Sequence, residues 1–123
     1  MGAKMNKIIK MLIKNVIQNN MLIHYSVPAG DKYSIKNNGV EILSVINGWA
    51  NNYYCISVNN KNVLSVKWDE TNSKPLTNEQ KDMIDIINVC KEKIDLQETA
   101  HSMNHNEMET ANFLQKSLCE LHH

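Results

Sequence analysis

Two histidines near the C-terminal end of the chain have the spacing most suggestive of chemistry. His101 and His105 lie four residues apart, and Glu98 precedes His101 by three. On an α-helix, side chains three or four positions apart share one face, so two imidazoles and a carboxylate placed in this way could hold a divalent ion. A catalytic zinc site also requires a further ligand and a general base, as in H-E-x-x-H, which the run His-Ser-Met-Asn-His lacks. We therefore predict no metal site, and keep His101, His105 and Glu98 as fallback ligands.

Aromatic residues form a second group with chemical potential. Six of the seven fall within residues 25–68, on predicted strands and the loops between them. Aromatic rings beside lysines can stack a nucleobase and neutralise a phosphate, although strands also favour aromatic residues for packing alone. The predicted ligand-binding residues are Trp49, Tyr53, Tyr54, Trp68, His101 and His105.

Motifs of the common enzyme classes are missing from the sequence. Its four glycines never cluster, which excludes a P-loop and a dinucleotide-binding fingerprint. There is no arginine, so a phosphate would be met only by lysines and backbone amides. No serine or cysteine lies in a nucleophile motif such as G-x-S-x-G. We expect a protein that is not an enzyme and uses no cofactor.

Charge divides the chain into two halves. Residues 1–68 hold eight lysines and two acidic residues, whereas residues 69–123 hold five lysines and eleven acidic residues, giving formal net charges of +6 and −6. Such halves attract one another within a chain or between copies, which favours a homo-oligomer over specific nucleic-acid binding. Lysines interrupt each apolar run near the N-terminus, so neither a signal peptide nor a membrane partner is expected. Three widely spaced cysteines favour buried thiols in the cytoplasm.

The elements that must position these residues follow from the apolar spacing. Residues 1–20 predict a basic amphipathic helix that begins near residue 4 and ends near Asn19. Residues 21–68 then alternate with period two and predict an antiparallel meander of four or five strands. Asn38-Gly39 predicts a type I′ hairpin turn, with Asn37 opposite Val40, Lys36 opposite Glu41 and Ile35 opposite Ile42.

A helical tail is predicted for residues 76–123. Thr77 and Gln80 form a capping box, and apolar residues from Met83 to Ile94 recur with helical spacing. Asp95 and Asn106 are possible further caps, so the tail is either two helices or one long helix with a break between residues 101 and 106. The prediction is one α+β domain over residues 1–123.

This layout, a short arginine-free chain with an antiparallel meander before two C-terminal helices, resembles that of the phage anti-Thoeris proteins. The resemblance extends over much of the chain, at the level of architecture. It implies a non-enzymatic protein of a phage or mobile element that sequesters a cyclic ADP-ribose-type signal without degrading it. It also implies that His101, His105 or lysines take the place of arginines around a pyrophosphate.

Two other functions stay open on the sequence. One is an immunity- or inhibitor-type protein that masks a protein partner through a sheet edge or its acidic helices. The other is a small metal-dependent protein that acts on nucleic acids through His101 and His105.

Overall fold

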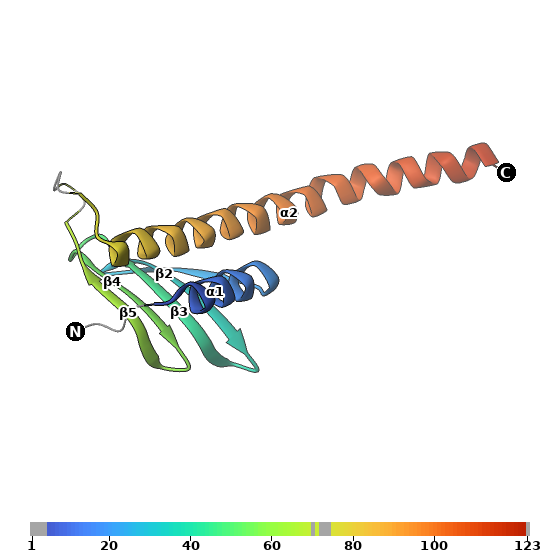
Figure 1. Ribbon diagram of the computed structural model, residues 1–123. Coiled ribbons are helices and arrows are strands. Elements are labelled where there is room, and N and C mark those ends of the chain that lie inside the picture. Colours follow the sequence, from blue (N-terminus) through green and yellow to red (C-terminus); the bar gives the residue numbers. More distant parts are fainter. Residues whose placement is uncertain (1–4, 70, 72–74, 123) are drawn as a thin grey trace.

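The computed structural model describes residues 5–69, 71 and 75–122, and within residues 101–122 it describes the backbone alone. A short helix is followed by five strands and one long helix (Figure 1). The strands form one antiparallel sheet in which each pairs with its neighbours in sequence, in the order β1-β2-β3-β4-β5. The predicted α+β class and the predicted meander are confirmed. The elements are α1 (Lys7–Asn19), β1 (Ile23–Val27), β2 (Gly30–Asn37), β3 (Val40–Gly48), β4 (Tyr53–Val58), β5 (Lys61–Lys67) and α2 (Asn78–His122).

Two of the hairpins turn on residues in the left-handed backbone region. Asn38 and Gly39 have φ of 53° and 79°, as the predicted type I′ turn requires. Asn59 and Asn60, between β4 and β5, have φ of 51° and 64°. Asparagine tolerates this region because its short polar side chain can hydrogen-bond locally. Asn38, Asn59 and Asn60 therefore help to fix the turns of these two hairpins.

The register between β2 and β3 contains one correction. Asn37 pairs with Val40 and Lys36 with Glu41, as predicted, but Ile35 pairs with Leu43 because a bulge lies between Ile35 and Lys36. The predicted pairing of Ile35 with Ile42 is wrong. A bulge adds one residue to one strand, and a shift of one residue exchanges the faces of every later side chain. In β3 it directs the alternate residues from Leu43 onward toward the helices.

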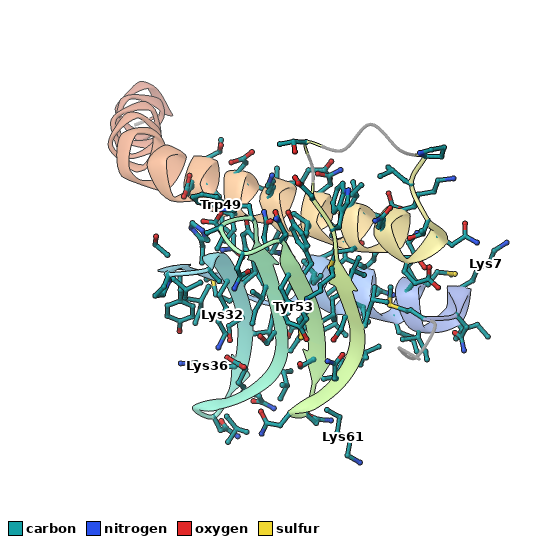
Figure 2. All side chains as sticks on the ribbon, turned by 90° about the vertical axis from the view of Figure 1, so that its left-hand side faces the viewer. Lys7, Lys32, Lys36, Trp49, Tyr53 and Lys61 are labelled. Atoms are coloured by element: carbon teal, nitrogen blue, oxygen red, sulfur yellow. The ribbon has the colours of Figure 1, made fainter. Side chains whose placement is uncertain are left out.

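The hydrophobic core lies between one face of the sheet and both helices. The opposite face, which is toward the viewer in Figure 2, is covered by neither of them. Burial raises the pKa of the Cys90 thiol to about 12, so this cysteine is a neutral core residue. Cys55 is also buried, which confirms the prediction for these two thiols. The residues at the centre of the core include Ile13, Ile17, Val45, Tyr54, Ile56, Leu64, Met83, Ile86 and Cys90.

Helix α1 begins at Lys7, later than predicted, because Asn6 caps it. The Asn6 Oδ1 accepts a hydrogen bond from the Ile9 amide at 2.8 Å. An N-cap residue has extended backbone, and satisfying one of the free amides of the first turn fixes the start of the helix there. The end at Asn19 agrees with the prediction.

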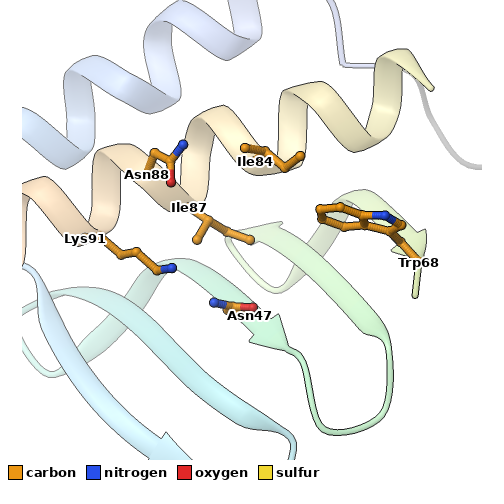
Figure 3. Close-up of a pocket in the computed structure, with 6 residues that line it drawn as sticks. All are labelled: Asn47, Trp68, Ile84, Ile87, Asn88 and Lys91. Carbon is orange, nitrogen blue, oxygen red and sulfur yellow. The ribbon is translucent and has the colours of Figure 1, made fainter. Parts of the chain in front are cut away.

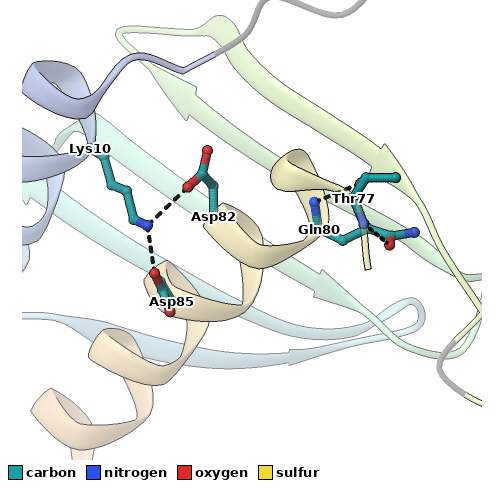
Figure 4. A network of polar contacts seen from close by, with 5 residues as sticks. All are labelled: Lys10, Thr77, Gln80, Asp82 and Asp85. Atoms are coloured by element: carbon teal, nitrogen blue, oxygen red, sulfur yellow. Dashed lines mark hydrogen bonds and ion pairs between the residues drawn. The ribbon is translucent and has the colours of Figure 1, made fainter. Parts of the chain in front are cut away.

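An ion-pair cluster joins α1 to the first turns of α2. The Lys10 Nζ lies 2.9 Å from Asp82 Oδ1 and 2.5 Å from Asp85 Oδ2 (Figure 4). The hydrogen bonds that Lys10 donates to Asp85 and Asp82 raise the pKa of its ammonium group. Further along, the Gln97 side chain bonds both the amide and the carbonyl of Leu22. Lys10 of the basic half is thus paired with two acidic residues of the other half within one chain.

The predicted capping box at the start of α2 is confirmed. The Gln80 amide donates to Thr77 Oγ1 at 3.1 Å, and the Thr77 amide donates to Gln80 Oε1 at 2.9 Å (Figure 4). These reciprocal bonds satisfy two amides that the first helical turn leaves free. The capping residues Thr77 and Gln80 therefore determine where α2 begins.

Helix α2 continues without interruption to His122, so the predicted break between residues 101 and 106 is wrong. Asp95 and Asn106 are interior residues of this helix. No glycine or proline occurs between residues 78 and 122, and capping residues end a helix only where its hydrogen-bond ladder stops. Within the described residues, no helix combines the length and apolar composition needed to cross a membrane.

Candidate functional site

The predicted aromatic residues are divided between the two faces of the sheet. Tyr53 and Tyr54 are consecutive in β4 and must point to opposite sides. Tyr54 is fully buried toward the helices, and its ring packs on Trp68 with centroids 5.3 Å apart. Tyr53 lies on the uncovered face, where its hydroxyl donates to Ser65 Oγ at 3.1 Å (Figure 2). Tyr54 and Trp68 are therefore brought together, and Tyr53 is separated from them.

Trp49 lies in the loop after β3 and is held by Asp31. Its Nε1 donates to Asp31 Oδ2 at 3.0 Å, and the other carboxylate oxygen lies 2.8 Å from His24 Nε2. The hydrogen bond with His24, followed by that with Trp49, lowers the pKa of Asp31. Gly30 allows this approach, since a Cβ there would lie 2.6 Å from Trp49 Cδ1 and its φ is +145°. Trp49 thus ties the loop after β3 to the start of β2.

The side chains of His101 and His105 lie outside the described part of the structure. Glu98, the third fallback ligand, is exposed on α2. Among the described residues, no group of three or more His, Cys, Asp or Glu side chains could hold a metal ion. The His101 and His105 predictions therefore remain predictions.

A cavity lies where α2 crosses the end of β3 and β5. Its volume is about 260 Å³, and it includes one predicted residue, Trp68 (Figure 3). The sheet supplies one wall and two turns of α2 supply the other. We call it the Asn47 cavity, and its described lining is Asn47, Trp68, Ile84, Ile87, Asn88 and Lys91.

Asn47 is the unusual member of this lining. The residue is 6% exposed, and its Oδ1 has no hydrogen-bond partner among the described residues. Leaving a buried acceptor unsatisfied costs on the order of 1–3 kcal/mol, so such groups are rare and are often completed by a ligand or water. In Figure 3 the Asn47 amide lies below Ile87, between Lys91 and Trp68. A hydrogen-bond donor would satisfy the amide oxygen if a neighbouring side chain moved to let it approach from the cavity.

The open side of the Asn47 cavity is polar and basic. Asn88 and Lys91 are both exposed on α2. The positive charge of Lys91 also contributes to the lowered pKa of Asp31, after the larger effects of His24 and Trp49. The cavity therefore combines an indole, aliphatic walls, a buried acceptor and a cation at its mouth.

Sequence reasoning missed Asn47, Asn88 and Lys91. A strand that ended at Ile46 would leave Asn47 in a loop, yet β3 continues to Gly48. The alternation of Leu43, Val45 and Asn47 places all three on one face of the strand, and this pattern could have identified Asn47. A polar residue at a core position is stable only when it has a hydrogen-bond partner. The contribution of α2 depends on the helix packing across the sheet.

No family model, no curated protein and no solved structure matches this chain.

Proposed function

We propose that this chain is a non-enzymatic binding protein that sequesters a small nucleotide-type ligand, with the base of the ligand in the Asn47 cavity. The observation that carries the proposal is the buried Asn47 Oδ1, which lacks a partner among the described residues and belongs to a residue of the cavity lining. A planar ring with an exocyclic amino group, such as adenine, would donate to this oxygen and stack on Trp68.

The size and charge of the cavity support a base rather than a whole dinucleotide. Sites for drug-sized ligands occupy roughly 300–1,000 Å³, and this cavity, at about 260 Å³, lies just below that range. Sugar and phosphate would therefore extend through the open side. There the exposed ammonium group of Lys91 would pair with a phosphate, because the chain has no arginine for this role.

The chemistry of the lining also favours a protein that binds its ligand over one that converts it chemically. Its described residues carry indole, amide, aliphatic and ammonium groups, and among them there is no carboxylate, imidazole, thiol or hydroxyl. Asn47 Oδ1 exposes less than 1 Å², so a ligand reaches it only if a neighbouring side chain in the wall moves. Binding should therefore change the surroundings of Trp68.

Tryptophan fluorescence tests this proposal. Trp49→Phe leaves Trp68 as the one indole of the chain, and it is then titrated with AMP and with cyclic ADP-ribose, the ligand type that the layout resemblance implies. We expect saturable quenching by at least one of them. Asn47→Leu in the same background should weaken binding by at least about tenfold, because the amide acceptor is lost. Asn37→Leu, at an exposed asparagine of β2, is the matched control and should bind normally.

Two results would overturn the proposal. The first is unchanged fluorescence with both nucleotides, together with no nucleotide released when the protein purified from cells is heat-denatured. The second is an equal loss of binding in Asn47→Leu and Asn37→Leu, since the buried amide would then contribute nothing specific.

A further inference from the structure

Helix α1 has a second apolar side that the core does not use. Ile13 and Ile17 are buried, whereas Ile8, Met11 and Leu12 are 69%, 68% and 59% exposed. Solvent-facing apolar residues in a contiguous strip are uncommon on monomers and mark interaction surfaces.

An apolar groove runs beside this strip. Its volume is about 360 Å³, and it lies between α1 and the strands near the two hairpin ends. We call it the α1 groove, and its lining includes Ile9, Leu12 and Val16 of α1 with Ile42 and Val58 of the sheet. Together the strip and the groove offer a site for an apolar helix face.

The C-terminal part of α2 is a helix that extends away from the sheet. The hydrogen bonds of Gln97 with Leu22 lie near the end of its packed part. Beyond them, residues 101–122, here called the arm, continue as helix away from the body (Figure 1). Helices in proteins derive most of their stability from packing an apolar face on a partner. The arm has the sequence spacing of such a face, with apolar residues three or four positions apart at Met108, Ala111, Leu114, Leu118 and Leu121.

The charges of the α1 groove and the arm are complementary. Lys7 and Lys14 stand four residues before and three after Met11, so they border the exposed strip. Lys61 pairs across the hairpin with Val58, which lines the sheet side of the groove, and Figure 2 shows Lys61 at the end of that hairpin. The arm contains three glutamates and one lysine, a formal net charge of −2 with neutral histidines.

We propose that the α1 groove binds the arm of a second copy of this chain, in a reciprocal exchange that forms a dimer. The unbroken α2 carries a chain's own arm away from its own groove, whereas a two-fold pair can place each arm in the partner's groove. This dimer goes beyond the proposed ligand site and does not depend on it.

Sedimentation of the full chain at tens of micromolar tests the exchange without any nucleotide. The wild type should be a dimer, and Leu12→Glu and Leu118→Glu should each raise the dimer dissociation constant at least tenfold. An equimolar mixture of these two variants should regain dimers, because one intact groove then meets one intact arm. Leu96→Glu, at a leucine of α2 that is 67% exposed and outside both surfaces, is the matched control and should remain dimeric. Circular dichroism verifies that each variant is folded.

Three outcomes would overturn the exchange. A monomeric wild type would do so at once. Loss of the dimer in Leu118→Glu but not in Leu12→Glu would mean that the arms pair with each other. A monomer that binds phosphatidylglycerol vesicles through Leu12 would make the strip a membrane-facing surface.

Discussion

The two helices form different pockets with the same face of one sheet. Where α2 crosses the end of β3, the Asn47 cavity contains a buried amide oxygen without a described partner and has Lys91 at its mouth. Where α1 lies beside the hairpin ends, the α1 groove is lined almost entirely by aliphatic side chains. The Asn47 cavity is suited to a small polar ring, and the α1 groove is suited to the apolar face of another helix.

This difference originates in the strands beneath the helices. The bulge in the β2–β3 pairing places Asn47 in the helix-facing row of β3, next to Tyr54 of the neighbouring strand. Near the hairpin ends the corresponding positions, Leu43 and Val58, are aliphatic. Position along one strand therefore decides whether the space under a helix is polar or apolar.

The largest expected effect separates the two sides of α1. Ile17→Ala should lower the free energy of unfolding by about 2–5 kcal/mol, because it leaves a cavity in the core. Ile8→Ala should change it by less than about 0.5 kcal/mol, because that side chain is 69% exposed. Urea denaturation of monomeric protein measures both. Similar losses in the two variants would show that α1 has no free side.

A smaller effect of opposite sign is expected in the Asn47 cavity. Asn47→Leu should raise the stability of the ligand-free protein by about 1 kcal/mol, because it removes an unsatisfied buried oxygen. Asn47→Asp should lower stability, because a carboxylate is then buried without a described partner. Thermal denaturation compares the three proteins. A lower stability of Asn47→Leu than of the wild type would contradict the inference that the Asn47 amide oxygen has no partner until a ligand binds.

The smallest effect concerns the cluster that holds α1 against α2. Lys10→Met should cost about 0.5–1 kcal/mol at neutral pH, a modest amount because solvent screens Asp85, which is 49% exposed. The pKa of Lys10 is raised above 10.5 in the folded protein, so its contribution is complete below that pH and is lost as pH rises through the raised value. Denaturation of both proteins near pH 8 and again at strongly alkaline pH measures this. A difference that persists at high pH would assign the effect to packing of the lysine stem.

Much of the fold could be predicted because its signals are local. The Asn38-Gly39 turn and the Thr77–Gln80 capping box each depend on a few adjacent residues, and both are present. The candidate site could be predicted only in part. Trp68 belongs to the cavity, but its partners Asn47 and Lys91 are far apart in the sequence and meet through packing of α2 on the sheet.

The amino-acid sequence by itself determined which segments are helices and strands and where the hairpins turn. Backbone preference, capping and apolar periodicity act over a few residues, so they can be deduced without the fold. Tertiary structure decided how β3 is offset by its bulge, which aromatic residues share a face and whether α2 is broken. Those outcomes depend on contacts between distant segments, and they place a polar Asn47 under one helix while an apolar groove borders the other.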